Sequence, residues 1–371
     1  MLANGFREKL ADMYENRLIS PFLQVTKEDL LKNGLIVYGG DIIGKLTIER
    51  LLANGIKPDW IVDANIDIIG KKVMGIDVLN PDSLKKAGDR FVFLCSTNIK
   101  AMSKTCKEKG ASKWITAAAL RKWFDMSCQF GICMEGSRHD DELEEVYTLL
   151  QDEKSKKILE ACVRWHHTFD NDFSSLMEPY VYFPEDLKEK IDYSHFVDAG
   201  AFTGDTLNEW MNIYKPEGKL FKYYAFEPMD ESWNQLQDYV KRLPKAVQEC
   251  ILTIKAGLSN RNTFIEMSGS RISQTESDTG IECKTIDSFF QSHPAPTIIK
   301  ADIEGAEMDM LMGAEQIIKK YKPALAIAVY HKYSDLWAIP LWIHKLNLDY
   351  KLYFRHNHPR FTDTVCFAIS S

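Results

Sequence analysis

The chain has 371 residues, of which 45% are hydrophobic and 27% charged, and its net charge at pH 7 is −7. This length favours two domains, and no apolar run reaches the about 18 residues that a membrane-spanning helix requires. The excess of acidic residues argues against nucleic acid as the main partner, because such binding requires a basic face. The first residues are charged where a secretory signal would be apolar, so we expect a cytoplasmic protein. Nothing in the composition indicates an oligomeric state.

The N-terminal third is predicted to begin with helices and to continue as a small α/β domain. Residues 1–33 carry apolar side chains at helical spacing, and residues 34–120 alternate short apolar strands with helices. This alternation is typical of a doubly wound parallel sheet, so we expect a Rossmann-like domain over residues 34–120. The expected strands are 35–39, 60–63 and 91–95, and the expected helices end near residues 54 and 109.

A first glycine turn, at residues 39–44, follows the first of these strands. Such a turn can hold a nucleotide, and Asp63 ends the next strand where a ribose-binding acid would stand. Asp41, however, takes the place of the second glycine of the dinucleotide fingerprint, where a carboxylate repels a pyrophosphate. Two alternatives stay open: an oxidoreductase or regulatory protein that binds NAD or a sugar nucleotide through this module, and a module used only for docking.

Residues 121–190 are predicted to form a helical linker, with a run of acidic residues on a solvated helix face. An aromatic segment, residues 180–184, ends this linker. The segment could roof a ligand pocket, or it could pack the linker against the domain that follows.

A second glycine turn lies in residues 195–206. A short apolar run leads to Asp198, glycines follow at Gly200 and Gly204, and a helix is predicted from Asp205. Glycine allows a sharp turn and the close approach of a ligand, and the free amides of a helix's first turn favour a negatively charged group. The spacing Asp-x-Gly-x-x-x-Gly is the form found in enzymes that use S-adenosylmethionine (SAM). The residues downstream must decide whether that indication holds.

Several predicted strands of the C-terminal half end in a polar residue or a glycine. In an open parallel sheet, ligands bind beyond the carboxyl ends of the strands, so these residues should meet at one edge. Glu227 follows Gly204 by about the spacing expected of a carboxylate that binds both ribose hydroxyls. A polar insertion at residues 263–284 is predicted to be a mobile, hairpin-like loop over the site. The residues at the strand ends are Asp198, Glu227, Gly257, Asp302 and His331.

Residues 180–371 resemble the FkbM-type SAM-dependent methyltransferases. The most specific phrase is Lys-x-Asp-x-Glu-Gly-x-Glu, at residues 300–307. The resemblance implies a class I methyltransferase domain over residues 191–371, with a seven-stranded sheet whose last strand is antiparallel. The phrases that carry it are 196–206, 225–228, 299–307, 330–332 and 363–368.

The same resemblance implies SAM as the cofactor and assigns residues to it. The backbone of the second glycine turn would hold the methionine part and the ribose, and Glu227 would bind the ribose hydroxyls. Leu258 or Ser259 would contact the adenine, while Asp198 would order the turn or meet the amino acid end. The residues expected at the cofactor are Asp198, Ala199, Gly200, Gly204, Glu227, Gly257, Leu258, Ser259 and Asp302.

The resemblance further implies methyl transfer to a hydroxyl of a sugar or natural product. An alcohol must lose its proton in such a transfer, and His331 is the expected general base because imidazole titrates near neutrality. Asp302 or Glu304 is the alternative base or the orienting acid, and Lys300 is expected to be a salt-bridged support. No metal ion is expected, since the carboxylates already have roles at separate strand ends. A protein that kept the fold for binding without catalysis is the remaining alternative.

Overall fold

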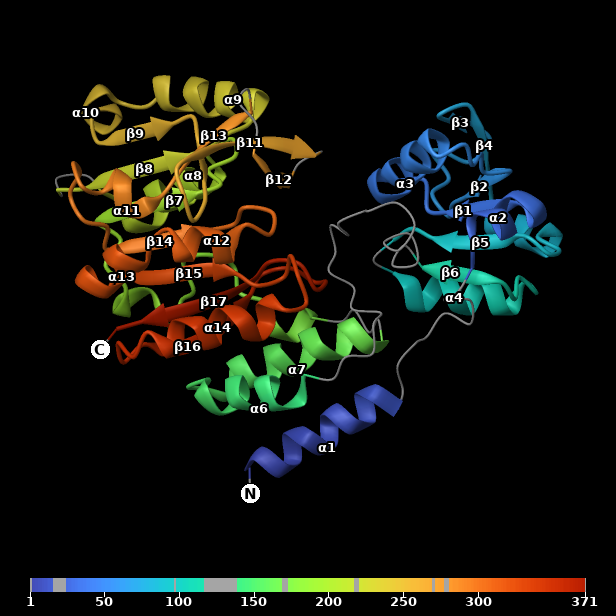
Figure 1. Cartoon of the computed structure of the whole chain (residues 1–371), viewed down its shortest axis with the longest axis horizontal. Helices are drawn as coiled ribbons and strands as arrows, with labels where there is room; N and C mark the ends of the chain where they lie inside the picture. Colours follow the sequence, from blue (N-terminus) through green and yellow to red (C-terminus); the bar gives the residue numbers. More distant parts are fainter. Residues whose placement is uncertain are drawn as a thin grey trace. The chain divides into compact units, whose positions relative to one another are not determined.

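The computed structural model describes residues 2–15, 25–96, 98–116, 139–168, 173–216, 220–268, 271–276 and 280–370. Contacts within the chain divide it into two compact units. The first unit comprises residues 1–7, 139–162 and 172–371, and the second comprises residues 8–138 and 163–171. Each unit is built around its own mostly parallel β-sheet (Figure 1). Within the described residues, no helix is both long and apolar enough to cross a bilayer.

The second unit contains a six-stranded sheet with the strand order β3-β4-β2-β1-β5-β6. Its strands pair in parallel except for β3, which is antiparallel to β4. The three predicted strands are present, and β3, β4 and β6 are additions that are too short to show a clear hydrophobic period. The strands are β1 (Leu35–Tyr38), β2 (Trp60–Val62), β3 (Lys72–Val73), β4 (Ile76–Leu79), β5 (Phe91–Leu94) and β6 (Trp114–Thr116). The helices are α1 (Leu2–Glu15), which the units share, α2 (Lys27–Asn33), α3 (Ile42–Ala53), η1 (Pro81–Lys86) and α4 (Ile99–Glu108).

Asp41 and Asp63, the two acids predicted at the first glycine turn, both accept hydrogen bonds from nearby backbone amides. The Asp41 side chain caps α3 by accepting the amide of Gly44 at 3.4 Å. The Asp63 carboxylate accepts the amides of Gly40 at 2.6 Å and Asn65 at 2.7 Å. These contacts explain the two acids by local structure, and nucleotide binding by this module stays a prediction.

The first unit contains a seven-stranded sheet with the order β16-β17-β15-β14-β7-β8-β9. Figure 1 shows these strands stacked, with β9 at the top and β16 at the bottom. Neighbouring strands pair in parallel, except that β17 is antiparallel to both β15 and β16. The predicted class I sheet, with its antiparallel last strand, is confirmed. The strands are β7 (His195–Ala199), β8 (Lys222–Phe226), β9 (Ile251–Ile254), β14 (Ile298–Ala301), β15 (Ala324–Ala328), β16 (Lys351–His356) and β17 (Thr364–Ile369).

Alternation of side chains along these strands gives the sheet two buried faces. On one face Phe196 and Tyr223 join a core cluster with Trp210 of α8. Tyr224, the next residue of β8, packs its ring edge-on against Phe289 of α11. The helices of this unit are α6 (Asp140–Leu149), α7 (Glu153–Thr168, shared by the units), η2 (Ser174–Leu176), η3 (Lys188–Lys190), α8 (Asp205–Tyr214), α9 (Asp230–Lys241), α10 (Lys245–Gln248), α11 (Ile286–Phe289), α12 (Glu307–Met312), α13 (Glu315–Tyr321) and α14 (Asp335–Lys345).

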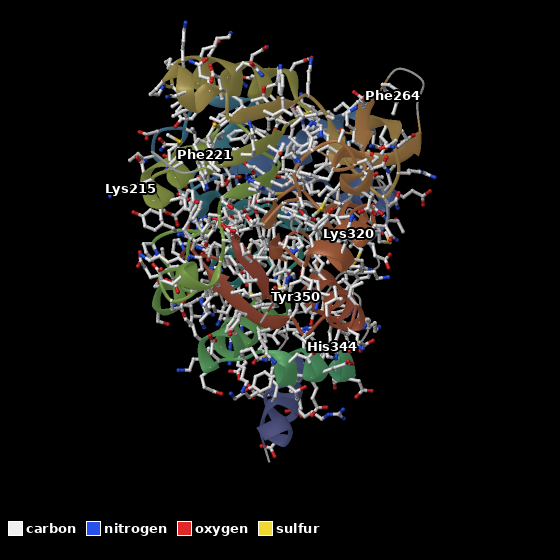
Figure 2. All side chains as sticks on the ribbon, turned by 90° about the vertical axis from the view of Figure 1, so that its left-hand side faces the viewer. Lys215, Phe221, Phe264, Lys320, His344 and Tyr350 are labelled. Atoms are coloured by element: carbon white, nitrogen blue, oxygen red, sulfur yellow. The ribbon has the colours of Figure 1, made fainter. Side chains whose placement is uncertain are left out.

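The predicted linker is mostly helical where it is described, and the insertion is more regular than the expected loop. The linker contains α6 and α7, and its residues 121–138 lie outside the described part. The insertion supplies three strands of a small sheet of order β10-β13-β11-β12, in which β10 precedes it, and Phe264 of β11 is exposed (Figure 2). Its hairpin character is confirmed, although residues 269–270 and 277–279 lie outside the described part. The strands are β10 (Gly257–Leu258), β11 (Thr263–Ser268), β12 (Arg271–Glu276) and β13 (Ile281–Lys284).

Arg355 of β16 attaches the segment around α7 to the large sheet. Its buried guanidinium donates to Asp152 at 2.7 Å and to Asp186 at 2.5 Å. Burial opposes its charge, but hydrogen bonds to the two carboxylates outweigh that cost and raise the pKa of Arg355. The ion pairs therefore join parts of the chain about 170 to 200 residues apart in sequence.

Candidate active site

A cavity of about 480 Å³ lies at the carboxyl ends of the central strands of the large sheet. That volume falls within the range of small-molecule sites. Its charged lining consists of five carboxylates, those of Asp205, Glu227, Glu231, Asp302 and Glu304, and one ammonium group, that of Lys300. Six of the predicted site residues line it: Gly200, Glu227, Gly257, Leu258, Asp302 and Glu304.

The second glycine turn packs directly on the end of β14. Gly200 has a φ of +80°, and a Cβ at this position would lie 2.0 Å from the backbone oxygen of Asp302. Only glycine tolerates both the left-handed backbone and this close approach. Phe202, at the tip of the turn, lines the cavity and is 57% exposed. The turn thus forms part of the cavity wall and presents an uncovered aromatic ring.

Glu227 is held in place by the backbone on both of its carboxylate oxygens. One oxygen accepts the amide of Phe202 at 2.9 Å, and the other accepts the amide of Met229 at 2.8 Å. The side chain is buried, and burial raises the pKa of the Glu227 carboxyl although the two amides oppose that effect. The carboxylate is therefore a fixed acceptor in the cavity wall, with lone pairs left for a ligand.

Asp198 lies beneath the turn rather than in the cavity. Its fully buried carboxylate contacts Lys300 Nζ at 2.7 Å and accepts the hydroxyl of Tyr223 at 2.7 Å. Lys300 Nζ also donates to the backbone oxygens of Gly200 at 2.7 Å and Ala199 at 3.3 Å. Of the two expectations for Asp198, ordering the turn agrees with these contacts, whereas direct contact with a ligand in the cavity does not. The geometry also makes Lys300 a salt-bridged support.

Asp302 carries a carboxylate that faces the cavity and is surrounded by donors. The hydroxyl of Tyr182 donates to Oδ2 at 2.8 Å, and the hydroxyl of Tyr330 lies 3.1 Å from Oδ1 and 3.2 Å from Oδ2. His331 Nε2 lies 3.4 Å from Oδ1. The side chain remains 26% exposed, so the carboxylate is both held and accessible.

His331 lies behind Asp302 and is not among the residues that line the cavity. Its Nδ1 lies 2.9 Å from Oε1 of Glu307, which is 1% exposed. Burial alone would lower the pKa of His331, but the carboxylates of Glu307, Asp302 and Glu304 outweigh it and raise the pKa to about 9. The ring is therefore an imidazolium at neutral pH, which differs from the neutral ring that a general base requires.

Asp302, Glu307 and His331 also offer ligand atoms within 4.8 Å of one another, the spacing of a possible cation site. Oε1 of Glu307, however, already accepts the amides of Ile303 at 2.9 Å and Gly305 at 3.3 Å. Together with the protonated ring between them, these bonds give the two carboxylates partners without an ion. Within the described residues, Oε2 of Glu307 and Nδ1 of His331 are nevertheless buried without a hydrogen bond, and the expectation of no metal stays a prediction.

Three further predicted cofactor residues do not line the cavity: Ala199, Gly204 and Ser259. Ala199 is completely buried in β7, and Gly204 is the left-handed cap of α8, with its φ of +93°. Ser259 is buried just after β10. These three residues shape the backbone around the cavity without facing it.

Sequence reasoning assigned no role at this site to Tyr182, Phe202, Tyr330 or Glu307. Tyr182 falls in the aromatic segment for which roofing a pocket was one of two interpretations. Tyr330 and Glu307 lie in phrases quoted for the family resemblance, directly beside His331 and Glu304–Gly305. Their positions near strand ends could be read from the sequence, but the directions of their side chains could not.

Comparison with known protein families identifies residues 198–352 as a match to the methyltransferase FkbM domain. The matched range begins at Asp198 and includes Glu227, Asp302 and His331. It does not include Tyr182. No curated protein sequence matches the chain.

Comparison with solved structures includes one match that supports the fold. A methyltransferase FkbM from Methylobacillus flagellatus KT matches with a TM-score of 0.70 and 20% identity, over 99% of this chain and 100% of that chain. A precorrin-6y C5,15-methyltransferase from Geobacter metallireducens matches with a TM-score of 0.31 and 11% identity, over 49% of this chain and 82% of that chain. An rRNA methylase from Streptococcus thermophilus matches with a TM-score of 0.31 and 14% identity, over 49% of this chain and 92% of that chain. The first similarity supports a shared arrangement of the fold, and scores as low as the other two carry no argument.

Proposed function

We propose that this chain, whose residues 198–352 form a methyltransferase FkbM domain, transfers a methyl group from SAM to a hydroxyl of a sugar or natural-product acceptor. One observation carries the proposal: a single cavity brings together the glycine turn, the fixed carboxylate of Glu227 and the accessible carboxylate of Asp302. The first two suit a nucleoside cofactor, and the third suits an acceptor that must lose a proton.

The cavity lining fits SAM by its chemistry. A carboxylate offers about four lone-pair positions, so Glu227 keeps capacity for the two ribose hydroxyls after binding its two amides. Leu258 and Phe226 offer apolar surface for an adenine, and Gly200 brings backbone to the cavity for the methionine part. These residues would hold SAM, which supplies, when bound, a methyl group on a sulfonium.

Asp302 is the proposed proton acceptor. As the acceptor oxygen took the methyl group that bound SAM would supply, releasing SAH, the Asp302 carboxylate would take the hydroxyl proton. His331 keeps its own proton at neutral pH, so its proposed role is to stabilise the carboxylate rather than to act as the base. Glu304, which also lines the cavity and is 47% exposed, is the alternative base. Alignment of the reacting atoms supplies much of the acceleration.

The test separates cofactor binding from transfer. Calorimetry with S-adenosylhomocysteine (SAH) should show binding to the wild-type protein, and Glu227→Gln should weaken it roughly 10- to 100-fold, the range for losing hydrogen bonds to a charged group. Asp302→Asn should leave SAH affinity intact and abolish transfer of tritiated methyl from SAM to a panel of neutral methyl glycosides. Glu145→Gln, on the exposed face of α6, is the matched control. A wild-type protein that binds neither SAM nor SAH would refute the proposal.

A further inference from the structure

Two tyrosine hydroxyls converge on the Asp302 carboxylate from different parts of the chain. Tyr182 reaches Oδ2 at 2.8 Å from the segment that precedes β7, and Tyr330 spans both oxygens from the residues after β15. We propose that these tyrosines are positioning residues that clamp Asp302 so that a free lone pair meets the acceptor hydroxyl. The inference rests on the proposed function and extends it to Tyr182, outside the matched residues 198–352.

Tyr182 is built into the core rather than resting on the surface. Its residue is 4% exposed, and its backbone oxygen accepts the hydroxyl of Tyr193 at 3.2 Å. Lys300 Nζ lies 5.1 Å from the centre of its ring, a cation–π contact, so the cation that supports the glycine turn also supports this ring. Phe183 packs beside it against Tyr193 and Phe196. The position of the hydroxyl is thus fixed by the packing of the neighbouring side chains.

Tyr330 is held by the backbone pairing of the residue before it and by the ring of the residue after it. The residue before it, Val329, donates its amide to the backbone oxygen of Thr364 at 2.9 Å, which continues the pairing of the sheet. The Tyr330 ring also lies 4.2 Å from the ring of His331, centre to centre. Tyr330 and His331 are neighbours in sequence, and both contact the same carboxylate.

Both hydroxyls act as donors at physiological pH. Burial, with the nearby charge of Asp302, raises the pKa of Tyr182 and of Tyr330 far above the usual range for a phenol. Neither can then take a proton from the acceptor. Lys300, His331 and Asp363 also interact electrostatically with Asp302.

The groups around Asp302 limit the places that are open to the acceptor. The two tyrosines occupy two of the about four lone-pair positions of the carboxylate, and His331 Nε2 faces Oδ1 at 3.4 Å as an ion-pair partner. The clamp therefore restricts the direction from which an acceptor hydroxyl can bind. A displacement of about 1 Å at a reacting centre can cost about 100-fold in rate, so a carboxylate free to rotate would be a poor proton acceptor.

The test uses the full chain and replaces each hydroxyl by hydrogen. Tyr182→Phe and Tyr330→Phe keep the rings and should shift the antisymmetric carboxylate stretching band of Asp302, assigned in the infrared difference spectrum by its loss in Asp302→Asn. With SAM and the methyl glycoside that gives the highest transfer, each variant should lower kcat about 10- to 100-fold and leave SAH affinity unchanged. The fold reduction in kcat of the double variant should be smaller than the product of the two single reductions, because both hydrogen bonds are made to one carboxylate.

Tyr350→Phe is the matched control. Its buried hydroxyl donates to the backbone oxygen of Pro323 at 2.6 Å, before the first residue of β15, and Figure 2 labels it. This variant loses the same kind of group, and it should change neither the infrared band nor kcat. An unshifted band in both Tyr182→Phe and Tyr330→Phe, or full turnover by Tyr182→Phe, overturns the clamp. Absence of SAH binding by the wild-type protein overturns the proposed function instead, and the infrared comparison still decides on the clamp.

Discussion

Glu307→Gln is expected to release the proton of His331. Glu307 is 1% exposed and places Oε1 2.9 Å from His331 Nδ1, and its charge is the largest of the effects that raise the pKa of that ring. Glutamine keeps an oxygen for the amides of Ile303 and Gly305 while removing the charge. Burial, which lowers the pKa of His331, then outweighs what remains, so the ring should be largely neutral at pH 7.5.

The size of the effect follows from the pKa. A rise from 6.5 to about 9 corresponds to about 3 kcal/mol of differential interaction in favour of the charged ring. Because the folded-state pKa is the higher one, this stabilisation is full below the unfolded pKa of 6.5 and is lost as the pH rises through about 9. Asp335, whose pKa burial raises to about 7, completes its titration below that upper range.

The assay compares denaturant unfolding of the wild-type protein and Glu307→Gln between about pH 7.5 and 9.5, where the linkage slope is about 1.4 kcal/mol per pH unit for one proton. The wild-type free energy of unfolding should fall more steeply with pH than that of the variant. An imidazole NMR titration of His331 should place the wild-type midpoint near 9 and the variant midpoint well below it. Equal slopes in the two proteins, or an unchanged midpoint in the variant, would refute the reasoning.

Three other predictions concern the turn, the ion pairs and the cation question. Gly200→Ala should lower the melting temperature and abolish SAH binding, because a Cβ would lie 2.0 Å from the Asp302 backbone oxygen; calorimetry of both properties checks this. Arg355→Met should lower the free energy of unfolding in urea by about 1 to 3 kcal/mol, since Asp152 and Asp186 lose charged hydrogen bonds but stay partly exposed, and an unchanged free energy would contradict it. A chelator should leave SAH affinity and transfer unchanged, and a loss reversed by added divalent metal would show that a cation binds.

The architecture of the large sheet was largely predictable from sequence. Its strands are short apolar runs whose ends are marked by acids, glycine or proline. The helices predicted between them indicate crossover connections, and therefore parallel pairing. In the second unit, β3, β4 and β6 escaped prediction. A two- to four-residue strand such as Ile76–Leu79 has too few residues to show a period, and its pairing with β2 is what makes it a strand.

The site was predictable as an edge of the sheet but not as a set of directed side chains. Asp198 and Asp302 both lie at strand ends, yet Asp198 is covered by Tyr223 and Lys300 while Asp302 faces the cavity. Position 198 lies within β7, whose two faces are both covered, and position 302 follows the last residue of β14. One residue beyond a strand is enough to exchange a structural carboxylate for an accessible one.

The sequence alone determined the strand–turn–helix of residues 195–206 and the acids that follow it, because these depend on local chain geometry and on residue type. The tertiary structure decided the protonation of His331 and the part taken by Tyr182. His331 is charged because Glu307, 24 residues earlier, is buried beside it, and Tyr182 reaches Asp302 across 120 residues of chain. Electrostatic energies and hydrogen bonds depend on distance in space, and only the packing of the sheet brings these groups within reach.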